Sequence, residues 1–190
     1  MDRAAVTRWR RAERERLLAL RSGAAAALRR DWSRAIETQL YDLLAQAPAL
    51  TLGVYWPFRA EFDPRPLVGR LIARGFAVAL PVVVDKKGPL EYRSWRPGDP
   101  LTDGVWGIPI PERREIAVPG AVLAPLVGFD RECYRLGYGG GYFDRTLAAL
   151  EPRPQAIGVG FELSSIDTIH PQDFDVAMDL IVTEAGIRRR

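Results

Sequence analysis

AVLAPLVGF, at residues 121–129, is followed in the chain by RLGYGGGYFDR at 135–145 and AIGVGF at 156–161. The first and third segments are continuous apolar runs, which are typical of strands buried on both faces of a sheet. Between them, residues 142–150 have a helical composition, and the glycines before them indicate a loop. Strand, helix and strand in this order predict a mainly parallel sheet.

The same alternation extends in both directions along the chain. It predicts a three-layer α/β fold, a mainly parallel sheet with helices on both faces, formed by one domain over residues 1–190. An N-terminal helical segment, residues 1–47, is expected to pack on this domain. Residues 96–120 are rich in proline and glycine and are expected to form a long structured loop. The other predicted helices lie at 3–21, 24–46 and 63–74, and the other strands at 50–55, 76–84, 90–95 and 180–183.

Composition excludes several classes of protein. The 190 residues are 47% hydrophobic and 27% charged, which is ordinary for a soluble globular protein. A single cysteine, Cys133, and a single histidine, His170, argue against a disulfide framework, a cysteine-based zinc site and a multi-histidine metal centre. No apolar run approaches the roughly 20 residues of a membrane span, and no secretory signal is visible. We therefore expect a cytoplasmic protein with no membrane partner.

The positive charge is concentrated at the amino end. Residues 1–35 contain ten arginines and four acids, a net +6, whereas the other residues sum to −3. Such a segment suits an anionic partner such as phosphate, nucleic acid or an acidic lipid surface, or else a solvated helix face. Because the rest of the chain is net negative and has no nucleic-acid motif, we expect no nucleic-acid partner.

The glycine segment, Gly137–Gly141, is the sharpest chemical signal. Four glycines in five positions let several backbone N–H groups surround one anion, and the helix that follows favours the same negative charge. Arg135 and Arg145 flank the segment and could clamp phosphate oxygens. Asp144 is suited to a Mg²⁺ ion that bridges phosphates. The alternative is a flexible turn with an N-capping aspartate.

Two common phosphate loops do not match this segment. No Gly-Lys-Ser/Thr occurs in the chain, which excludes a Walker A loop. A dinucleotide fingerprint needs a third glycine where Tyr142 stands, and its turn should follow the strand at once, whereas the polar stretch 130–135 intervenes.

The segment from Arg135 to Arg145 resembles the signature of the 5-formyltetrahydrofolate cyclo-ligase family, also called methenyltetrahydrofolate synthetases. Two departures from the family pattern stand out: Arg10 takes the place of a usual lysine, and Cys133 that of a common glycine. Further matches follow in the family's order over nearly the whole chain: Tyr55-Trp56-Pro57 with Glu61, Leu80-Pro81-Val82, Trp106-Gly107-Ile108-Pro109, Phe129-Asp130, Asp175 with Asp179, and Ile181–Glu184.

The resemblance implies an ATP- and Mg²⁺-dependent enzyme that converts 5-formyltetrahydrofolate to 5,10-methenyltetrahydrofolate, with release of ADP and phosphate. Phosphorylation of the formyl oxygen makes a leaving group, and ring closure then expels it. Such chemistry needs positioning and charge neutralisation more than a protein nucleophile. The partners would be small molecules, with ATP as co-substrate and Mg²⁺ as cofactor, and the protein would be a monomer.

The resemblance also assigns roles to individual residues. Without the resemblance, Glu61 could be a solvated loop acid, and Trp56 and Trp106 could be core aromatics, rather than residues that bind folate. Another phosphate-binding α/β enzyme, such as a sugar-phosphate isomerase, is the alternative function, and a nucleic-acid-binding protein is the weaker one. The implied catalytic residues are Arg135, Tyr142 and Arg145; the ATP-binding residues are Arg10, Arg11, Arg14, Arg135, Leu136, Gly137, Tyr138, Gly139, Gly140, Gly141, Tyr142 and Phe143; the folate-binding residues are Trp56, Glu61 and Trp106; and the metal ligands are Asp144 and Asp175.

Overall fold

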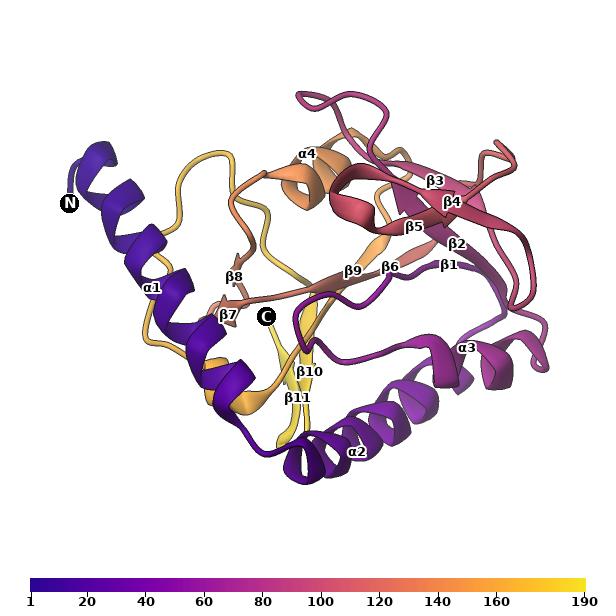
Figure 1. Ribbon diagram of the computed structural model, residues 1–190, viewed down its shortest axis with the longest axis horizontal. Coiled ribbons are helices and arrows are strands. Elements are labelled where there is room, and N and C mark those ends of the chain that lie inside the picture. The colour runs from indigo at the N-terminus through magenta and orange to yellow at the C-terminus, as the bar shows by residue number, and fades with distance from the viewer.

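A seven-stranded sheet forms the centre of the computed structural model, which describes residues 1–190 (Figure 1). Its five inner strands are parallel, while the strand at each edge is antiparallel to its neighbour. This arrangement confirms the mainly parallel sheet that the apolar runs predict. In spatial order the strands are β11 (Gly186–Arg189), β10 (Leu180–Thr183), β9 (Gln155–Val159), β6 (Ala121–Pro125), β1 (Thr51–Gly53), β2 (Ala77–Val82) and β3 (Glu91–Ser94).

Helices cover both faces of this sheet, as predicted. One face carries the larger core, in which Leu52 and Leu123 pack with α2 (Ala26–Ala45) and α3 (Arg65–Ile72). The other face carries a second core, in which Val122 packs with α4 (Tyr142–Ala149). Neighbours Val122 and Leu123 point to opposite faces because side chains alternate along a strand. In Figure 1, α2 and α3 lie below the sheet and α4 lies above it.

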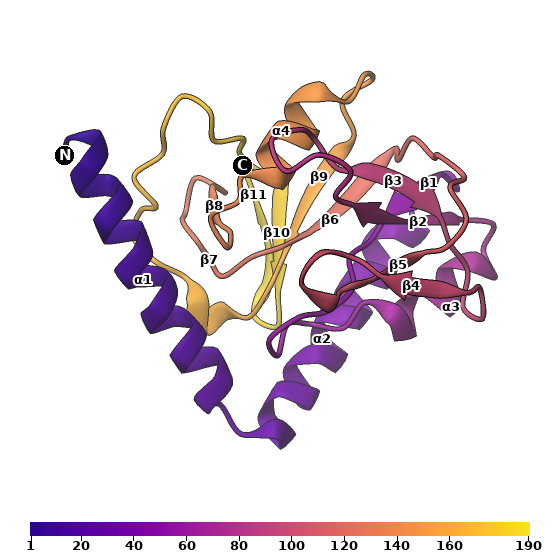
Figure 2. The same cartoon turned by 45° about the horizontal axis from the view of Figure 1, so that its top comes forward.

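The N-terminal segment forms two helices, close to the predicted bounds. The first, α1 (Arg3–Gly23), meets α2 at an angle, so that the two form a V (Figure 2). Asp2 caps α1 by accepting the N–H of Ala5. Leu17 of α1 packs in a third, smaller core with Val127, Leu136 and Ile169. No helix of the structure combines the length and apolar character that a membrane crossing requires.

The apolar run 121–129 does not form one strand. Its first part is β6, which ends at Pro125, and its last two residues form β7 (Gly128–Phe129), which pairs with β8 (Arg135–Leu136) outside the main sheet. Proline has no N–H to extend the ladder, which explains the end of β6. The glycine segment therefore follows a separate hairpin.

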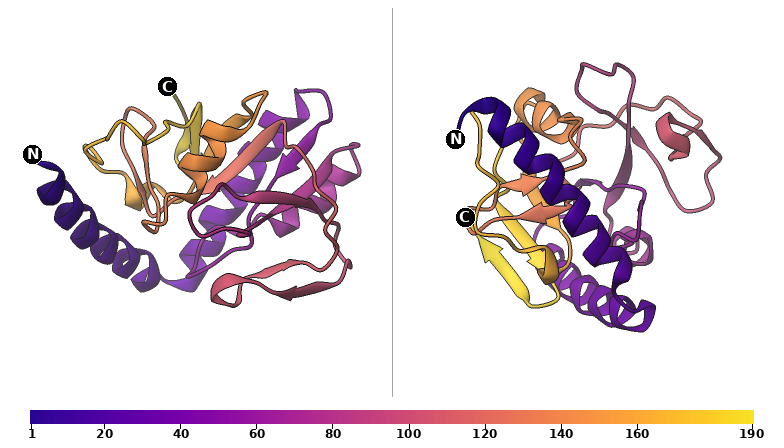
Figure 3. Two further views of the ribbon diagram at one scale, coloured as in Figure 1. Left: turned by 90° about the horizontal axis from the view of Figure 1, so that it is seen from above. Right: turned by 60° about the vertical axis from the view of Figure 1, so that its left-hand side comes forward.

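Residues 96–120 are more regular than the predicted loop. They contain an antiparallel hairpin of β4 (Leu101–Asp103) and β5 (Pro109–Pro111), joined through a 3₁₀ turn, η1 (Val105–Gly107). Prolines are tolerated in such an isolated pair because each strand has one unpaired edge. In both views of Figure 3 the hairpin lies far from the amino terminus of α1. The edge strand β11 was also not predicted.

Candidate active site

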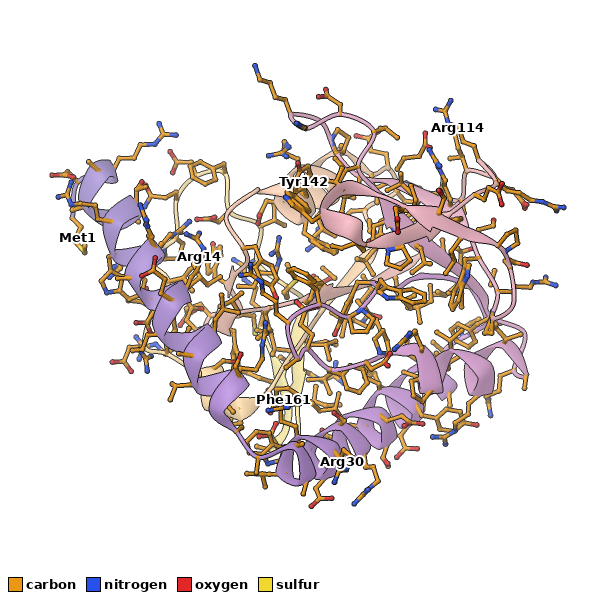
Figure 4. All side chains as sticks on the ribbon, viewed as in Figure 1. Met1, Arg14, Arg30, Arg114, Tyr142 and Phe161 are labelled. Atoms are coloured by element: carbon orange, nitrogen blue, oxygen red, sulfur yellow. The ribbon has the colours of Figure 1, made fainter.

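A cavity of about 470 Å³ opens at the carboxyl ends of the parallel strands, where α/β sheets bind ligands. Tyr55, Val83 and Pro125 line it from the ends of β1, β2 and β6. The glycine segment lies on its wall, together with residues of α1 and of the β4–β5 hairpin. Figure 4 shows Arg14 on the side of α1 that faces the rest of the molecule, and Tyr142 at the start of α4. Segments far apart in sequence therefore share this cavity.

A side chain in place of any of the four glycines of this segment would meet a close neighbour or a strained φ. Gly139 and Gly141 adopt φ of +99° and +65°, a region that favours glycine. A Cβ atom on Gly140 would lie 2.7 Å from the ring of Tyr142. Gly141 begins α4 without any side-chain cap, so the alternative of an N-capping Asp144 is wrong. The first N–H groups of α4 carry no such cap beside the cavity, which suits an anion.

Arg135 lies under this segment as a buried cation with unfilled hydrogen-bond donors. Arg135 is only 7% exposed, and the one hydrogen bond of its side chain runs from Nη2 to Oδ2 of Asp144, at 3.0 Å. Its Nε atom is buried without a partner, and burial lowers the pKa of the guanidinium. Arg135 lines the cavity, and its Nη1 group, which faces Gly137, makes no hydrogen bond to the protein, so this amino group suits an anionic acceptor in the cavity.

The arginines of α1 differ sharply in their partners. Arg10 is buried, and its guanidinium is taken up by Asp175 and by the carbonyls of Ile169 and His170. Arg14 also lines the cavity, and its Nε donates to the carbonyl of Gly137 at 2.7 Å. Its two amino groups make no hydrogen bond to the protein, and burial lowers its pKa. Arg14 therefore has free donors beside the glycine segment, whereas the donors of Arg10 are already bonded to acceptors of the protein.

The neighbouring Arg11 lies outside the cavity lining. It faces solvent and pairs with Glu15 on the surface of α1. The structure thus brings two of the three predicted N-terminal arginines to the cavity.

Glu61 lies at another part of the same cavity. Its Oε2 accepts the N–H of Phe58 at 2.8 Å, and its Oε1 accepts the hydroxyl of Tyr138 at 2.8 Å. Burial raises the pKa of this carboxyl, although both hydrogen bonds act in the opposite direction. It is not the solvated loop acid that composition alone allows.

The two predicted tryptophans have different surroundings. Trp106, on the turn η1, is 65% exposed, lines the cavity and packs edge-on against Tyr142, with ring centroids 5.9 Å apart. Trp56 lines the cavity between the guanidinium of Arg65, 4.5 Å from its ring, and the edge of Trp95. Trp106 is therefore an exposed wall of the cavity, whereas Trp56 is partly packed into the core.

Arg145 is not among the residues that line the cavity. Its guanidinium donates to the carbonyls of Gly88, Gly140 and Lys86, and it stacks on Tyr142. It therefore braces the glycine segment against the β2–β3 connection.

The two predicted metal ligands both line the cavity, and each is paired with an arginine. No group of three or more histidine, cysteine, aspartate or glutamate residues is arranged to hold a metal ion. Oδ2 of Asp144 accepts from Arg135 and Oδ1 accepts the N–H of Val176, which leaves lone pairs on both oxygens. Asp144 therefore fits a Mg²⁺ that takes its other ligands from phosphates and water.

Two residues near the site were not predicted from the sequence. Arg21 of α1 donates to the hydroxyl of Tyr138 at 2.7 Å, and Phe174, which lines the cavity, is exposed below the guanidinium of Arg3. A signal for Arg21 exists, because Arg10, Arg14 and Arg21 recur at spacings of four and seven, which is one face of a helix.

Comparisons with known proteins give relatives of one family. Residues 6–184 match the sequence profile of the 5-formyltetrahydrofolate cyclo-ligase family. A 5-formyltetrahydrofolate cyclo-ligase of Mycolicibacterium smegmatis is 32% identical over 142 residues, which are 70% of this chain and 73% of that protein. One of Escherichia coli is 28% identical over 146 residues, 73% of this chain and 80% of that protein. The structure of Aquifex aeolicus 5,10-methenyltetrahydrofolate synthetase, 26% identical, superposes with a TM-score of 0.82 over 95% of this chain and 92% of that one. This chain belongs to the 5-formyltetrahydrofolate cyclo-ligase family.

Proposed function

We propose that this protein uses ATP to convert 5-formyltetrahydrofolate to 5,10-methenyltetrahydrofolate, with release of ADP and phosphate. The observation that carries the proposal is the buried guanidinium of Arg135 beside the glycine segment, with an unpaired amino group, in one cavity with the partly buried carboxylate of Glu61. The first suits phosphate and the second suits the N–H groups of a pterin. The matches to named cyclo-ligases support this assignment.

The phosphates of ATP would bind at the glycine segment. The backbone N–H groups of Gly137–Gly141 and the start of α4 are donors for phosphate oxygens. Arg135 and the amino groups of Arg14 would supply the positive charge, and Arg10 would act mainly by holding Asp175 near them. Leu136, Tyr142 and Phe143 would form the adjoining wall. Positive groups fixed before the reaction stabilise the charge that develops on the transferring phosphoryl group.

The folate would bind toward Glu61. An ionised carboxylate accepts hydrogen bonds from ring N–H groups, and burial strengthens such bonds. Trp106 offers an exposed aromatic face to the pterin or benzoyl ring, while Trp56 supports Glu61's side of the cavity.

The reaction then needs alignment more than a protein nucleophile. The formyl oxygen attacks the terminal phosphorus of ATP, a P–O bond forms and ADP leaves. The second nitrogen of the substrate then forms the C–N bond that closes the five-membered ring, and the phosphate leaves with the former formyl oxygen and takes up the proton that this nitrogen loses. Holding the reacting atoms in contact inside one cavity contributes to the acceleration together with the positive groups around the phosphates.

Mg²⁺ would be held by Asp144, with Asp175 as a second candidate, and would neutralise phosphate charge. We also propose that residues 1–190 work as a single domain, because α1 supplies two arginines to the cavity. A monomer in the cytoplasm stays the prediction from the sequence.

The direct experiment follows the near-ultraviolet absorbance of methenyltetrahydrofolate. Purified protein with 5-formyltetrahydrofolate should form the product only when ATP and Mg²⁺ are both present. Equal product formation without nucleotide would overturn the proposed function, and equal formation after EDTA treatment would overturn the Mg²⁺ requirement.

Glu61→Gln tests the folate side. Loss of a charge-assisted hydrogen bond should weaken folate binding by about 1.5–3 kcal/mol and leave ATP binding nearly unchanged. Because burial raises the pKa of Glu61, wild-type folate affinity should fall as pH drops through a value above the ordinary 4.5, and the variant should lack this fall. Calorimetry with each ligand separates the effects. Asp63→Asn, which changes a half-exposed carboxylate two residues away and outside the cavity lining, is the control.

A further inference from the structure

Three side chains from three separate segments form a continuous hydrogen-bonded chain beside the cavity. Arg21 of α1 donates from Nη2 to the hydroxyl of Tyr138 at 2.7 Å, and that hydroxyl donates to Oε1 of Glu61 at 2.8 Å. Tyr138 belongs to the glycine segment, whereas Glu61 belongs to the connection between β1 and α3. The chain therefore links the proposed phosphate side of the cavity to the proposed folate side.

The direction of each hydrogen bond follows from the groups. A guanidinium can only donate, so the hydroxyl oxygen of Tyr138 must accept from Arg21. Its single proton is then available to Glu61, whose ionised carboxylate can only accept. Arg21 is buried, and its other amino group donates to the carbonyl of Leu126. No carboxylate pairs with Arg21 directly, so Tyr138 carries the contact between this cation and Glu61.

The turn that carries Glu61 has a strained backbone, and Tyr138 contacts this turn. Residues Phe58 to Glu61 form a tight turn closed by the hydrogen bond from the N–H of Glu61 to the carbonyl of Phe58. Arg59 and Ala60, at its centre, have φ of +47° and +59°, which side chains rarely adopt. The Phe58 N–H holds Oε2 of Glu61, and the ring of Tyr138 packs on that of Phe58. Tyr138 thus contacts the turn through both its hydroxyl and its ring.

We propose that Tyr138 is a positioning residue that couples the two ligands: phosphates that order the glycine segment fix Tyr138, and Tyr138 in turn fixes Glu61 for the folate. The inference rests on the proposed function. By linkage, the coupling is reciprocal, so each ligand tightens the binding of the other by the same factor. Coupling of this kind is typically about 5- to 150-fold.

The test is a calorimetric measurement of 5-formyltetrahydrofolate affinity with and without the non-hydrolysable β,γ-imido analogue of ATP, both with Mg²⁺. Wild-type protein should bind folate at least about fivefold more tightly when the analogue is present. In Tyr138→Phe the ratio should fall below about twofold, because the ring and its packing stay while the link to Glu61 is lost. Tyr134→Phe is the matched control, since Tyr134 lies three positions before the glycine segment in the chain and its hydroxyl makes no hydrogen bond to the protein.

A double variant separates positioning from a structural effect. Adding Glu61→Gln to Tyr138→Phe should leave the ratio unchanged, since Tyr138→Phe has already removed the hydrogen bond between the two residues. A Tyr138→Phe protein that binds both ligands more weakly but keeps the wild-type ratio would overturn the inference, as would a wild-type ratio near one. Failure of the proposed function is distinct, because wild-type protein would then bind no 5-formyltetrahydrofolate or form no methenyltetrahydrofolate.

Discussion

Two arginine–aspartate pairs line the same cavity, and they are built differently. Arg10 and Asp175 meet through two hydrogen bonds of 3.1 and 2.5 Å, and backbone groups occupy much of what is left. Arg135 and Asp144 meet through one hydrogen bond of 3.0 Å, and Nε of Arg135 has no partner. Both pairs are largely buried, with side-chain exposures of 10% and 8% against 4% and 16%.

Burial and residue type therefore do not distinguish the roles of these pairs, whereas unfilled donors do. The closed pair, Arg10 with Asp175, is satisfied by the protein itself and ties α1 to the segment before β10. The open pair, Arg135 with Asp144, keeps donors and lone pairs for something that the protein does not supply. We infer that the closed pair stabilises the structure around the cavity and that the open pair interacts with the ligands bound in it.

Breaking the closed pair should give the largest effect, on stability. Arg10→Met leaves the buried Asp175 without a cation, which costs about 3–5 kcal/mol of unfolding free energy. For a chain of this size that lowers the melting temperature by roughly 6 to 20 °C. Thermal unfolding measures the shift. The double variant Arg10→Met/Asp175→Leu should recover most of it, and a double variant as unstable as the single one would contradict the closed-pair interpretation.

Arg135→Lys should chiefly affect turnover. Lysine keeps the charge next to Asp144 but loses the planar fork, and removing one such donor from a transition state costs about 10²- to 10³-fold in rate. The absorbance assay gives kcat/KM, and the melting temperature should shift little. Arg10→Lys, the matched change in the closed pair, should retain more turnover. Similar losses in both variants would remove the distinction between the pairs.

The two aspartates should differ in their effect on the proposed magnesium requirement. Asp144→Asn should raise the Mg²⁺ concentration for half-maximal rate by about tenfold, because a hard cation loses a charged oxygen ligand. Asp175→Asn should raise it less, by under about threefold, since Asp175 is committed to Arg10. Magnesium titrations of both variants test this, and the reverse order would make Asp175 the main ligand.

Arg11→Ala should have the smallest effect of these substitutions. The side chain of Arg11 is 83% exposed and its partner Glu15 is one helical turn away. Such surface pairs contribute about 0.5 kcal/mol or less, so neither the melting temperature nor the KM for ATP should change measurably. A clear rise in that KM would bring Arg11 into the nucleotide site, as the family pattern allows.

Much of this fold could be predicted from local patterns. Continuous apolar runs give the inner strands, and the Arg/Ala/Leu-rich N-terminal segment gives two helices. The missed elements are those that tertiary pairing stabilises against local preference. Pro109 and Pro111 disfavour a strand but are accommodated in the isolated β4–β5 pair. The polar strand β11 forms because β10 offers its edge.

The site was predictable in its residue types but less so in its pairings. The glycine segment and Arg135 follow from a local motif, because the chemistry of phosphate binding is local, whereas the role predicted for Glu61 follows only from the family resemblance. The partners of Arg10 are more than 150 residues away in sequence, and those of Tyr138 lie in two other segments. No local pattern states which arginine will be satisfied by the protein and which will be left with open donors.

The ion pair between Arg10 and Asp175 also determines when the cavity can form during synthesis. Its partners are separated by 165 positions, which ribosomes translate in roughly 8 to 30 s at about 5–20 residues per second. During that interval α1 lacks the segment that receives Arg10, while α2 already has part of its own core from β1 and α3. Contacts this distant form slowly because they close a long loop. The helix α1, made before the rest of the fold, is thus among the last parts to reach its final place.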